Sequence, residues 1–347
     1  MVKVFKCFLI AVLVLVLAVA GVFYAMFRRE IATIAAVEQL DDALFKLEYK
    51  ADYGLDEFLK VGAKSDAELK EFIISRLLKG IPLDFELPEL GCSTFAAKLE
   101  NGDSVYGRNF DELACPSMVV VTRPENGYAS VSMVNLSYIG YSFDYLPDAV
   151  QNRLLTLAAP YVPLDGVNEK GLTAGMLYIS SAPTDQQGDK IDITTTSAVR
   201  MILDKCATVD EAVEMLSQYN MHSSAGGCFH FHIADAQGGS AVVEYVNDEM
   251  MVVEEKAATN FLFNPIPGVR EIGRDRYDTM IAALEENGGV FADERDAMTL
   301  LEAVAQHGGP DSQAGTRWSC IYNQTEPSLL LSVNRDYENL YSFELDE

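Results

Sequence analysis

The sequence predicts an α+β fold in which antiparallel sheets are layered with helices. Short β-type runs come in blocks separated by pairs of helical segments, whereas a parallel sheet would alternate strand and helix. Between the first two runs lies Asn101-Gly102, a pair typical of a tight hairpin turn. The chain has 347 residues and is 49% apolar, a composition typical of globular proteins. We therefore expect either two domains or one large domain with appendages.

The N-terminus begins with an apolar segment, residues 1–29. Cys7 to Phe27 form 21 consecutive uncharged positions, enough for a helix to span a bilayer core of about 30 Å. Arg28-Arg29 directly after the run favours an uncleaved membrane anchor, while Ala18-Val19-Ala20 suits a cleavable signal peptide. Both interpretations place the rest of the chain outside the cytoplasm, either anchored or secreted, and we favour the anchor.

Residues 30–91 are expected to form a helical segment and a linker. Apolar side chains recur at helical spacing through residues 31–80, and Ser65 with Glu68 forms a capping-box pattern. Glycines and prolines crowd residues 80–91, which indicates a domain boundary there. The expected domains are thus 1–29, 30–91 and 92–347.

Beyond this linker the expected elements alternate in blocks. Thr208 with Glu211 gives a second capping box, and Gly238-Gly239 marks a second turn. Strands are expected at 93–99, 104–108, 118–122, 129–136, 228–234, 240–245, 250–253, 257–263, 317–322, 329–333 and 340–344, and helices at 194–206, 208–219, 270–286 and 293–307.

Composition excludes several classes of function. The formal net charge is −26, and no basic stripe with interleaved aromatics occurs, so we expect no nucleic-acid partner. The six cysteines show no C-x-x-C or metal-ligand spacing, and His230 with His232 lacks a third ligand nearby, so we expect no metal or other cofactor. Neither disulfide pairing nor oligomeric state can be read from the sequence.

The chemistry concentrates around Cys92, the first residue after the linker. The Asn101-Gly102 hairpin folds Arg108 and Asp111 back toward it. A free thiol has a pKa of about 8.5, so a neighbouring guanidinium would help to form the reactive thiolate. If the chain were cut between Gly91 and Cys92, the new α-amino group would have a reference pKa of about 7.7–8, suited to a base near neutral pH.

Five motifs in order give the chain a family resemblance. They are Cys92-Ser93-Thr94-Phe95, Gly107-Arg108-Asn109-Phe110-Asp111, Asp165-Gly166-Val167-Asn168-Glu169-Lys170-Gly171-Leu172, His230-Phe231-His232-Ile233-Ala234-Asp235 and Ala258-Thr259-Asn260. In this order the motifs resemble the choloylglycine hydrolase family over roughly residues 92–345. That family contains bile salt hydrolases, penicillin V acylases and acid-ceramidase relatives. The resemblance implies a four-layer αββα N-terminal-nucleophile hydrolase, and residues 30–91 resemble the pro-segments of the acid-ceramidase and penicillin-acyltransferase branches.

The resemblance also implies roles for individual residues. Cys92 would be the nucleophile, Arg108 and Asp111 would tune and orient it, and Asn260 would donate to the oxyanion. Tyr178 would supply its backbone N–H as a second oxyanion donor.

Two further positions are less specific. Arg274 most resembles the late active-site arginine of the family, with Arg276 as a close rival. Asn168 belongs to a motif that we interpret mainly as a hairpin turn, with any substrate-binding role secondary.

The sequence therefore predicts an amidase that cleaves a linear amide of an N-acyl small molecule through a thioester on Cys92, after self-cleavage at Gly91-Cys92. Two alternatives stay open. In an acyltransferase of the same fold, a second amine would replace water in the last step. In an inactive extracytoplasmic binding protein, the fold would remain without turnover. The acyl and amine parts of the substrate are not specified by the sequence.

Overall fold

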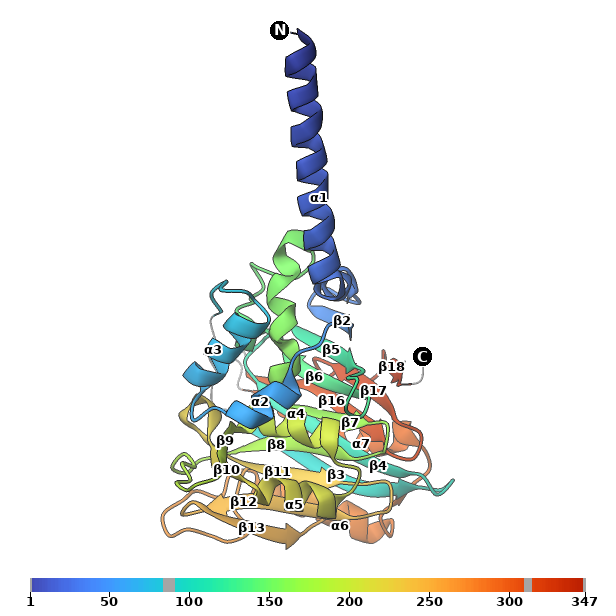
Figure 1. The fold of residues 1–347 in the computed structure, drawn as a ribbon. Helices are drawn as coiled ribbons and strands as arrows, with labels where there is room; N and C mark the ends of the chain where they lie inside the picture. The colour runs from blue at the N-terminus through green and yellow to red at the C-terminus, as the bar shows by residue number, and fades with distance from the viewer. Residues whose placement is uncertain (1, 84–90, 309–313, 346–347) are drawn as a thin grey trace.

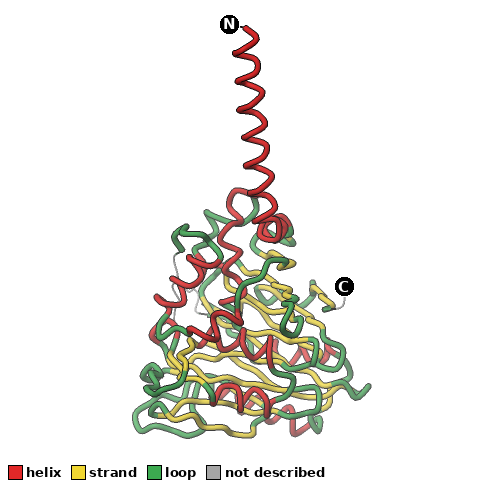
Figure 2. Tube along the Cα trace, in the orientation of Figure 1, coloured by secondary structure: helices red, strands yellow, loops and turns green. Residues whose placement is uncertain are grey.

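The structure is a computed structural model that describes residues 2–83, 91–308 and 314–345. Figure 1 shows a body of strands and helices from which the N-terminal helix α1 (Val2–Ala35) projects. Strands fill the centre of the body and helices cover its outside, as the tube in Figure 2 also shows. The expected α+β class is confirmed.

The larger of the two main sheets has nine strands. All neighbours are antiparallel except β2 and β5, which are parallel. The order across the sheet is β1 (Val37–Gln39), β2 (Leu44–Tyr49), β5 (Ser117–Thr122), β6 (Ser130–Asn135), β7 (Asp165–Asn168), β8 (Thr173–Ile179), β11 (Cys228–Ala234), β12 (Ser240–Val246) and β13 (Glu249–Glu254).

The second main sheet has seven strands and carries Cys92 near one end of β3. Its order is β14 (Ala257–Ala258), β3 (Gly91–Leu99), β4 (Ser104–Glu112), β16 (Gly315–Asn323), β17 (Ser328–Val333) and β18 (Tyr341–Glu344), and β15 (Val290–Phe291) adds to β3 in parallel. A separate parallel pair consists of β9 (Ile191–Thr194) and β10 (Tyr219–His222).

Helices cover the outer face of each main sheet. The helices α4 (Thr195–Lys205) and α5 (Val209–Ser217) contact β7, β8, β11 and β12, while α6 (Arg274–Glu286) and α7 (Glu294–Ala303) contact β3, β4, β14 and β16. The sheets contact each other through β3 with β8 and β7 with β16. The order of layers is therefore helix, sheet, sheet, helix, and the buried apolar residues fill the spaces between them. The described part of the chain also contains three 3-10 segments: η1 (Leu136–Ile139), η2 (Val150–Tyr161) and η3 (Ser224–Gly226).

The segment between α1 and the linker differs from the all-helical expectation. The helices α2 (Leu55–Val61) and α3 (Asp66–Arg76) form, and Ser65 caps α3 by accepting the N–H of Glu68. Residues 44–49, however, form β2, because Phe45, Leu47 and Tyr49 alternate with Lys46 and Glu48, a period of two that the helical spacing had masked. Since β1 pairs with β2 and β2 pairs with β5, this segment contributes two strands to the same sheet as residues 92–347. Residues 84–90 of the expected linker lie outside the described residues.

Three more expectations need correction. The strand expected at 257–263 ends at Ala258, because the chain leaves the sheet before Asn260. The helix expected from residue 270 begins at Arg274, after Gly273 in a left-handed conformation. Strands β7 and β8 were not expected at all. Strand β7 carries a motif that resembles a turn, and β8 contains Gly175, a residue type that is depleted in strands.

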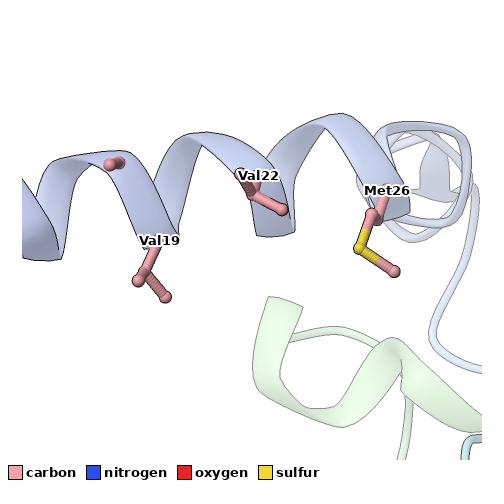
Figure 3. Close-up of a pocket in the computed structure, with 4 residues that line it drawn as sticks. Val19, Val22 and Met26 are labelled. Atoms are coloured by element: carbon pink, nitrogen blue, oxygen red, sulfur yellow. The ribbon is translucent and has the colours of Figure 1, made fainter.

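Helix α1 carries exposed apolar side chains such as Leu13, Leu17 and Met26. Figure 3 shows Val19, Val22 and Met26 beside a shallow, wholly apolar depression along this helix. Within the described residues, no single helix combines the length and the apolar composition needed to cross a membrane. Two parts of α1, Leu9–Val19 and Tyr24–Ala35, reach that standard only together, across a bend of 57°.

Candidate active site

Cys92 lies on β3 directly opposite Phe110 of β4, and its side chain is fully buried. The two strands are joined by the expected hairpin, in which Gly102 adopts a φ of 97° that favours glycine. Arg108 of β4 directs Nη2 to the sulfur of Cys92 at 3.3 Å. The structure thus places a guanidinium beside the thiol, as the hairpin predicted.

Arg108 is itself held by Asp165 of β7. The guanidinium Nε lies 2.7 Å from Oδ2 of Asp165, and both side chains are completely buried. Trp318 donates to the same carboxylate at 3.3 Å, and Tyr322 donates to its other oxygen. Asp165 opens the third family motif, but sequence reasoning did not select it as a site residue, because nothing local shows that β7 of one sheet faces β4 of the other.

Asp111 lies opposite Gly91, the residue that precedes Cys92. A Cβ atom placed on Gly91 would lie only 3.2 Å from Oδ2 of Asp111, so the carboxylate packs closely against this peptide. Thr316 donates to Oδ1 at 2.6 Å, and Arg276 donates to Oδ2 at 3.0 Å. Asp111 is therefore a buried, paired carboxylate at the Gly91-Cys92 junction.

The arginine next to Cys92 is Arg276 and not Arg274. Arg276 is buried and donates to the carbonyl of Cys92 at 2.8 Å and to Oδ1 of Asn260 at 2.8 Å, besides Asp111. Arg274 is the first residue of α6. Its side chain is 43% exposed, pairs with Glu271, and lies over the ring of Phe261 with the guanidinium carbon 3.9 Å from the ring centroid. The choice of Arg274 is corrected to its rival, because α6 begins at residue 274 and directs position 276 inward.

Asn260 joins the site from the segment after β14. Its Oδ1 accepts the backbone N–H of Cys92 at 2.8 Å, and its Nδ2 donates to the carbonyl of Tyr178 at 2.8 Å. These partners fix the orientation of the amide, because Oδ1 also accepts from Arg276. The side chain of Tyr178 packs edge-to-face on Phe229. The carbonyl of Tyr178 thus reaches the cluster, and the expected role of its N–H as an oxyanion donor stays a prediction.

Asn168 does not join this cluster. Its Nδ2 donates to the carbonyls of Leu203 and Cys206, at 2.9 and 2.7 Å, and its Oδ1 accepts the N–H groups of Lys170 and Leu172. The two bonds from Nδ2 join the β7–β8 turn to the C-terminal end of α4, and the two accepted by Oδ1 close the turn itself. These contacts support the interpretation of Asn168 as a turn residue, and its secondary substrate-binding role stays a prediction.

The thiol of Cys92 is protonated at neutral pH in the intact chain. Burial raises its pKa to about 11, and the charges of Arg108 and Arg276 offset this only in part. A thiol in this state is a poor nucleophile until a base removes its proton.

The two histidines of β11 have different surroundings. Burial lowers the pKa of His232 to about 3, so this ring is neutral and bridges Thr94 and Ser240 through its two nitrogens. His230 is buried, and neither ring nitrogen has a hydrogen bond within the described residues. In the same part of the chain, no group of three potential ligands gathers as a metal site would require.

Comparison with known proteins gives a consistent result. Residues 92–261 match the model of the linear amide C-N hydrolases, choloylglycine hydrolase family. Penicillin V acylase of Pectobacterium atrosepticum is 30% identical over 103 residues, which is 26% of this chain and 27% of that enzyme. The aligned part thus spans about a quarter of the relative.

Solved structures resemble most of the chain. A conjugated bile acid hydrolase from Clostridium perfringens has a TM-score of 0.56 at 16% identity and covers 74% of this chain and 92% of its own. Penicillin V acylase from Agrobacterium tumefaciens has a TM-score of 0.50 at 17% identity, with coverages of 74% and 87%. At these identities the likeness shows a shared fold.

Proposed function

We propose that Cys92 is the nucleophile of an amidase acting on an N-acyl small molecule, because residues 92–261 match the model of the linear amide C-N hydrolases, choloylglycine hydrolase family. The observation that carries the proposal is the convergence on one cysteine of Arg108 at its sulfur, Arg276 at its carbonyl and Asn260 at its N–H.

A spacing in the similar structures supports the choice of Cys92 and Arg108. Two structures of the conjugated bile acid hydrolase from Clostridium perfringens each carry one substitution. In one of them a cysteine is replaced by alanine, and in the other an arginine is replaced by leucine. The two replaced residues are 16 positions apart in that protein. Cys92 and Arg108 are also 16 positions apart.

The proposed reaction has two steps. The sulfur of Cys92 adds to the amide carbonyl, the C–N bond breaks, and the amine leaves with the proton from the thiol, so that an acyl thioester remains. Water then cleaves the thioester, releasing the carboxylic acid and restoring the thiol. Asn260 is the side-chain donor for the oxyanion, because Nδ2 carries a second hydrogen besides the one directed at Tyr178.

We also propose that the chain activates itself by cleavage before Cys92. The thiol attacks the carbonyl carbon of Gly91, the peptide C–N bond breaks, and the released amino group takes up the thiol proton. Water then hydrolyses the thioester on Cys92. The new α-amino group is the base that the buried thiol lacks, and Asn260 already accepts a hydrogen bond from this nitrogen.

N-terminal sequencing and thiol labelling test both proposals. We expect active protein to carry a new terminus at Cys92, one equivalent of iodoacetamide on Cys92 to abolish hydrolysis, and Cys92→Ala to stay uncut. Cys206→Ala is the matched control, because Cys206 is also a buried cysteine but lies at the end of α4. Full activity of an intact chain would refute the self-cleavage mechanism.

Assays against a panel of amides would define the substrate. The panel includes bile salt conjugates, penicillin V, N-acyl homoserine lactones and N-acyl ethanolamines, each with and without an added amine. Transfer of the acyl group to the added amine would instead indicate an acyltransferase, and an inert Cys92 would indicate a binding protein.

For the N-terminus, we propose that α1 anchors the chain to a membrane with the amidase outside the cytoplasm. The uncharged run from Cys7 to Phe27 and the exposed apolar side chains of α1 support this proposal. The uncut Cys92→Ala variant of the full-length protein, expressed in a host, should stay with the membrane pellet after carbonate extraction, while residues 30–347 of the same variant should not. Recovery of full-length protein in the supernatant would contradict the anchor.

A further inference from the structure

Glu244 of β12 is a buried carboxylate outside the cluster around Cys92. Its side chain is completely buried, yet it accepts three hydrogen bonds. Oε2 accepts the N–H of Phe263 at 3.0 Å, and Oε1 accepts the N–H and the side-chain Nδ2 of Asn264 at 2.7 and 2.8 Å. All three donors belong to one segment, the chain that follows Asn260.

His230 contacts both Glu244 and the same segment. Its Nδ1 lies 3.9 Å from Oε2 of Glu244, and its ring stacks on Phe263 with centroids 6.5 Å apart. Burial alone would raise the pKa of Glu244, but the hydrogen bonds and the neighbouring His230 lower it below its usual value. The carboxylate is therefore ionised and binds its N–H donors as charge-assisted hydrogen bonds.

The segment that Glu244 binds, the chain after Asn260, has little strand pairing with either sheet. Strand β14 ends at Ala258, and Asn260 pairs with Ile272 only through an isolated bridge. Phe263 and Asn264 come three and four residues after Asn260. Glu244 thus binds the chain where regular strand pairing has stopped.

The same segment also reaches α6. The rings of Phe261 and Phe263 lie 5.2 and 5.7 Å from the ring of Tyr277, and 5.0 Å from each other. Tyr277 follows Arg276, which binds Asn260 and the carbonyl of Cys92. Movement of residues 261–264 would therefore disturb both Asn260 and Arg276.

We propose that Glu244 is a positioning residue for Asn260: its buried carboxylate fixes the backbone at Phe263 and Asn264 and so holds the amide of Asn260 against Cys92. The inference rests on the proposed function, because it assigns Glu244 a part only if Asn260 serves the reaction at Cys92. Glu244 lies on β12, next to the edge strand β13 of the nine-stranded sheet, and does not touch the reacting atoms.

A double-mutant cycle tests this role. The probe is p-nitrophenyl acetate, whose thioester-forming step releases one equivalent of p-nitrophenolate as a burst, without knowledge of the natural substrate. We expect Asn260→Ala to lower the burst rate by about 10²–10³ and Glu244→Gln by about tenfold, because Gln offers an NH₂ group to donors that need an acceptor. The double variant should be no slower than Asn260→Ala alone, with the half-saturating ester concentration unchanged.

Two further variants control for folding. Asn264→Ala removes only one of the three bonds from a half-buried position and should lower the burst rate by roughly two- to fivefold, again not in the Asn260→Ala background. Glu249→Gln replaces an exposed glutamate at the start of β13 and should match the wild type. Circular dichroism and urea unfolding check each variant.

The outcomes separate the two proposals. Rates of Glu244→Gln and Asn264→Ala equal to wild type, or effects that multiply with that of Asn260→Ala, would overturn the positioning role while leaving the amidase intact. A burst of equal rate and size in wild type and Cys92→Ala, or no release of p-nitrophenolate by wild type, would overturn the proposed function first.

Discussion

Replacing Arg276 by alanine should impair both self-cleavage and hydrolysis. The guanidinium donates to the carbonyl of Cys92 at 2.8 Å, to Asp111 at 3.0 Å and to Asn260 at 2.8 Å, and its side chain is only 7% exposed. Its loss leaves the carboxylate of Asp111 buried, with Thr316 as its remaining side-chain donor among the described residues. Removing one partner of a buried ion pair destabilises a protein by about 3–5 kcal/mol.

The neighbouring arginine provides a matched control. Arg274→Ala removes an exposed ion pair with Glu271, of about 0–1 kcal/mol, and a cation–π contact with Phe261 of about 0.5–1 kcal/mol. We therefore expect its free energy of unfolding to fall by at most about 2 kcal/mol and its kcat/KM to stay within about threefold of the wild type. Arg276→Ala should lower kcat/KM by on the order of 10²-fold or more, because Cys92 and Asn260 both lose a partner that positions them.

Urea unfolding, gel analysis of self-cleavage and hydrolysis of p-nitrophenyl acetate measure these effects. A double variant, Arg276→Met with Asp111→Asn, separates stability from activity. It leaves no unpaired charge, so it should recover most of the lost stability while the rate stays low. An Arg274→Ala variant as damaging as Arg276→Ala, or a double variant that recovers its rate, would contradict this role of Arg276.

Four other predictions concern single groups. Asp111→Asn should keep the fold but lower turnover by on the order of 10²-fold, because the charge at the Gly91-Cys92 junction is lost; near wild-type rates would make the carboxylate structural. Asn260→Ala should lower kcat by about 10²–10³ with little change in KM. Tyr178→Phe should have almost no effect on kcat, since we assign only the main chain of Tyr178 to the site. The reverse pattern would assign the phenol of Tyr178 as the oxyanion donor. Asn168→Ala should lower the free energy of unfolding by about 2–4 kcal/mol without changing KM, measured by urea unfolding and steady-state kinetics, and a raised KM would restore its binding role. The rate of alkylation of Cys92 in the intact chain should rise about tenfold per pH unit up to about pH 11, because the raised pKa keeps the thiol protonated below that pH. A rate that levels off near pH 8 would show that the pKa of Cys92 is not raised.

Local signals predicted the part of the site that lies on one hairpin. Asn101-Gly102 fixed the pairing of β3 with β4, and this pairing places Arg108 and Asp111 near Cys92. Strand β2 was missed because a segment of six residues can satisfy helical and strand periodicities at once. Its partner β5 follows about 70 residues later, and no local pattern indicates such a pairing.

The remaining site residues depend on tertiary structure. Arg274 and Arg276 differ by two positions on a helix and so face different sides of α6, but the starting residue of the helix decides which side faces Cys92. Asp165 pairs with Arg108 of the other sheet, which lies 57 residues earlier in the chain. Glu244 accepts the N–H of Phe263, which lies 19 residues later. Such contacts follow from how the sheets stack, which composition and periodicity do not specify.

The parallel pairing of β2 with β5 has a practical consequence for making the enzyme. A recombinant chain that starts at Cys92 would lack both β1 and β2, so β5 would become an open sheet edge with unpaired backbone groups. The apolar side chains of β5 that now pack beside Phe45 and Leu47 would lose that cover. Unprotected edges of this kind template aggregation. Soluble protein is therefore best obtained from a chain that retains residues 30–91 through folding, and the proposed cut before Cys92 should then leave strands β1 and β2 paired in the sheet.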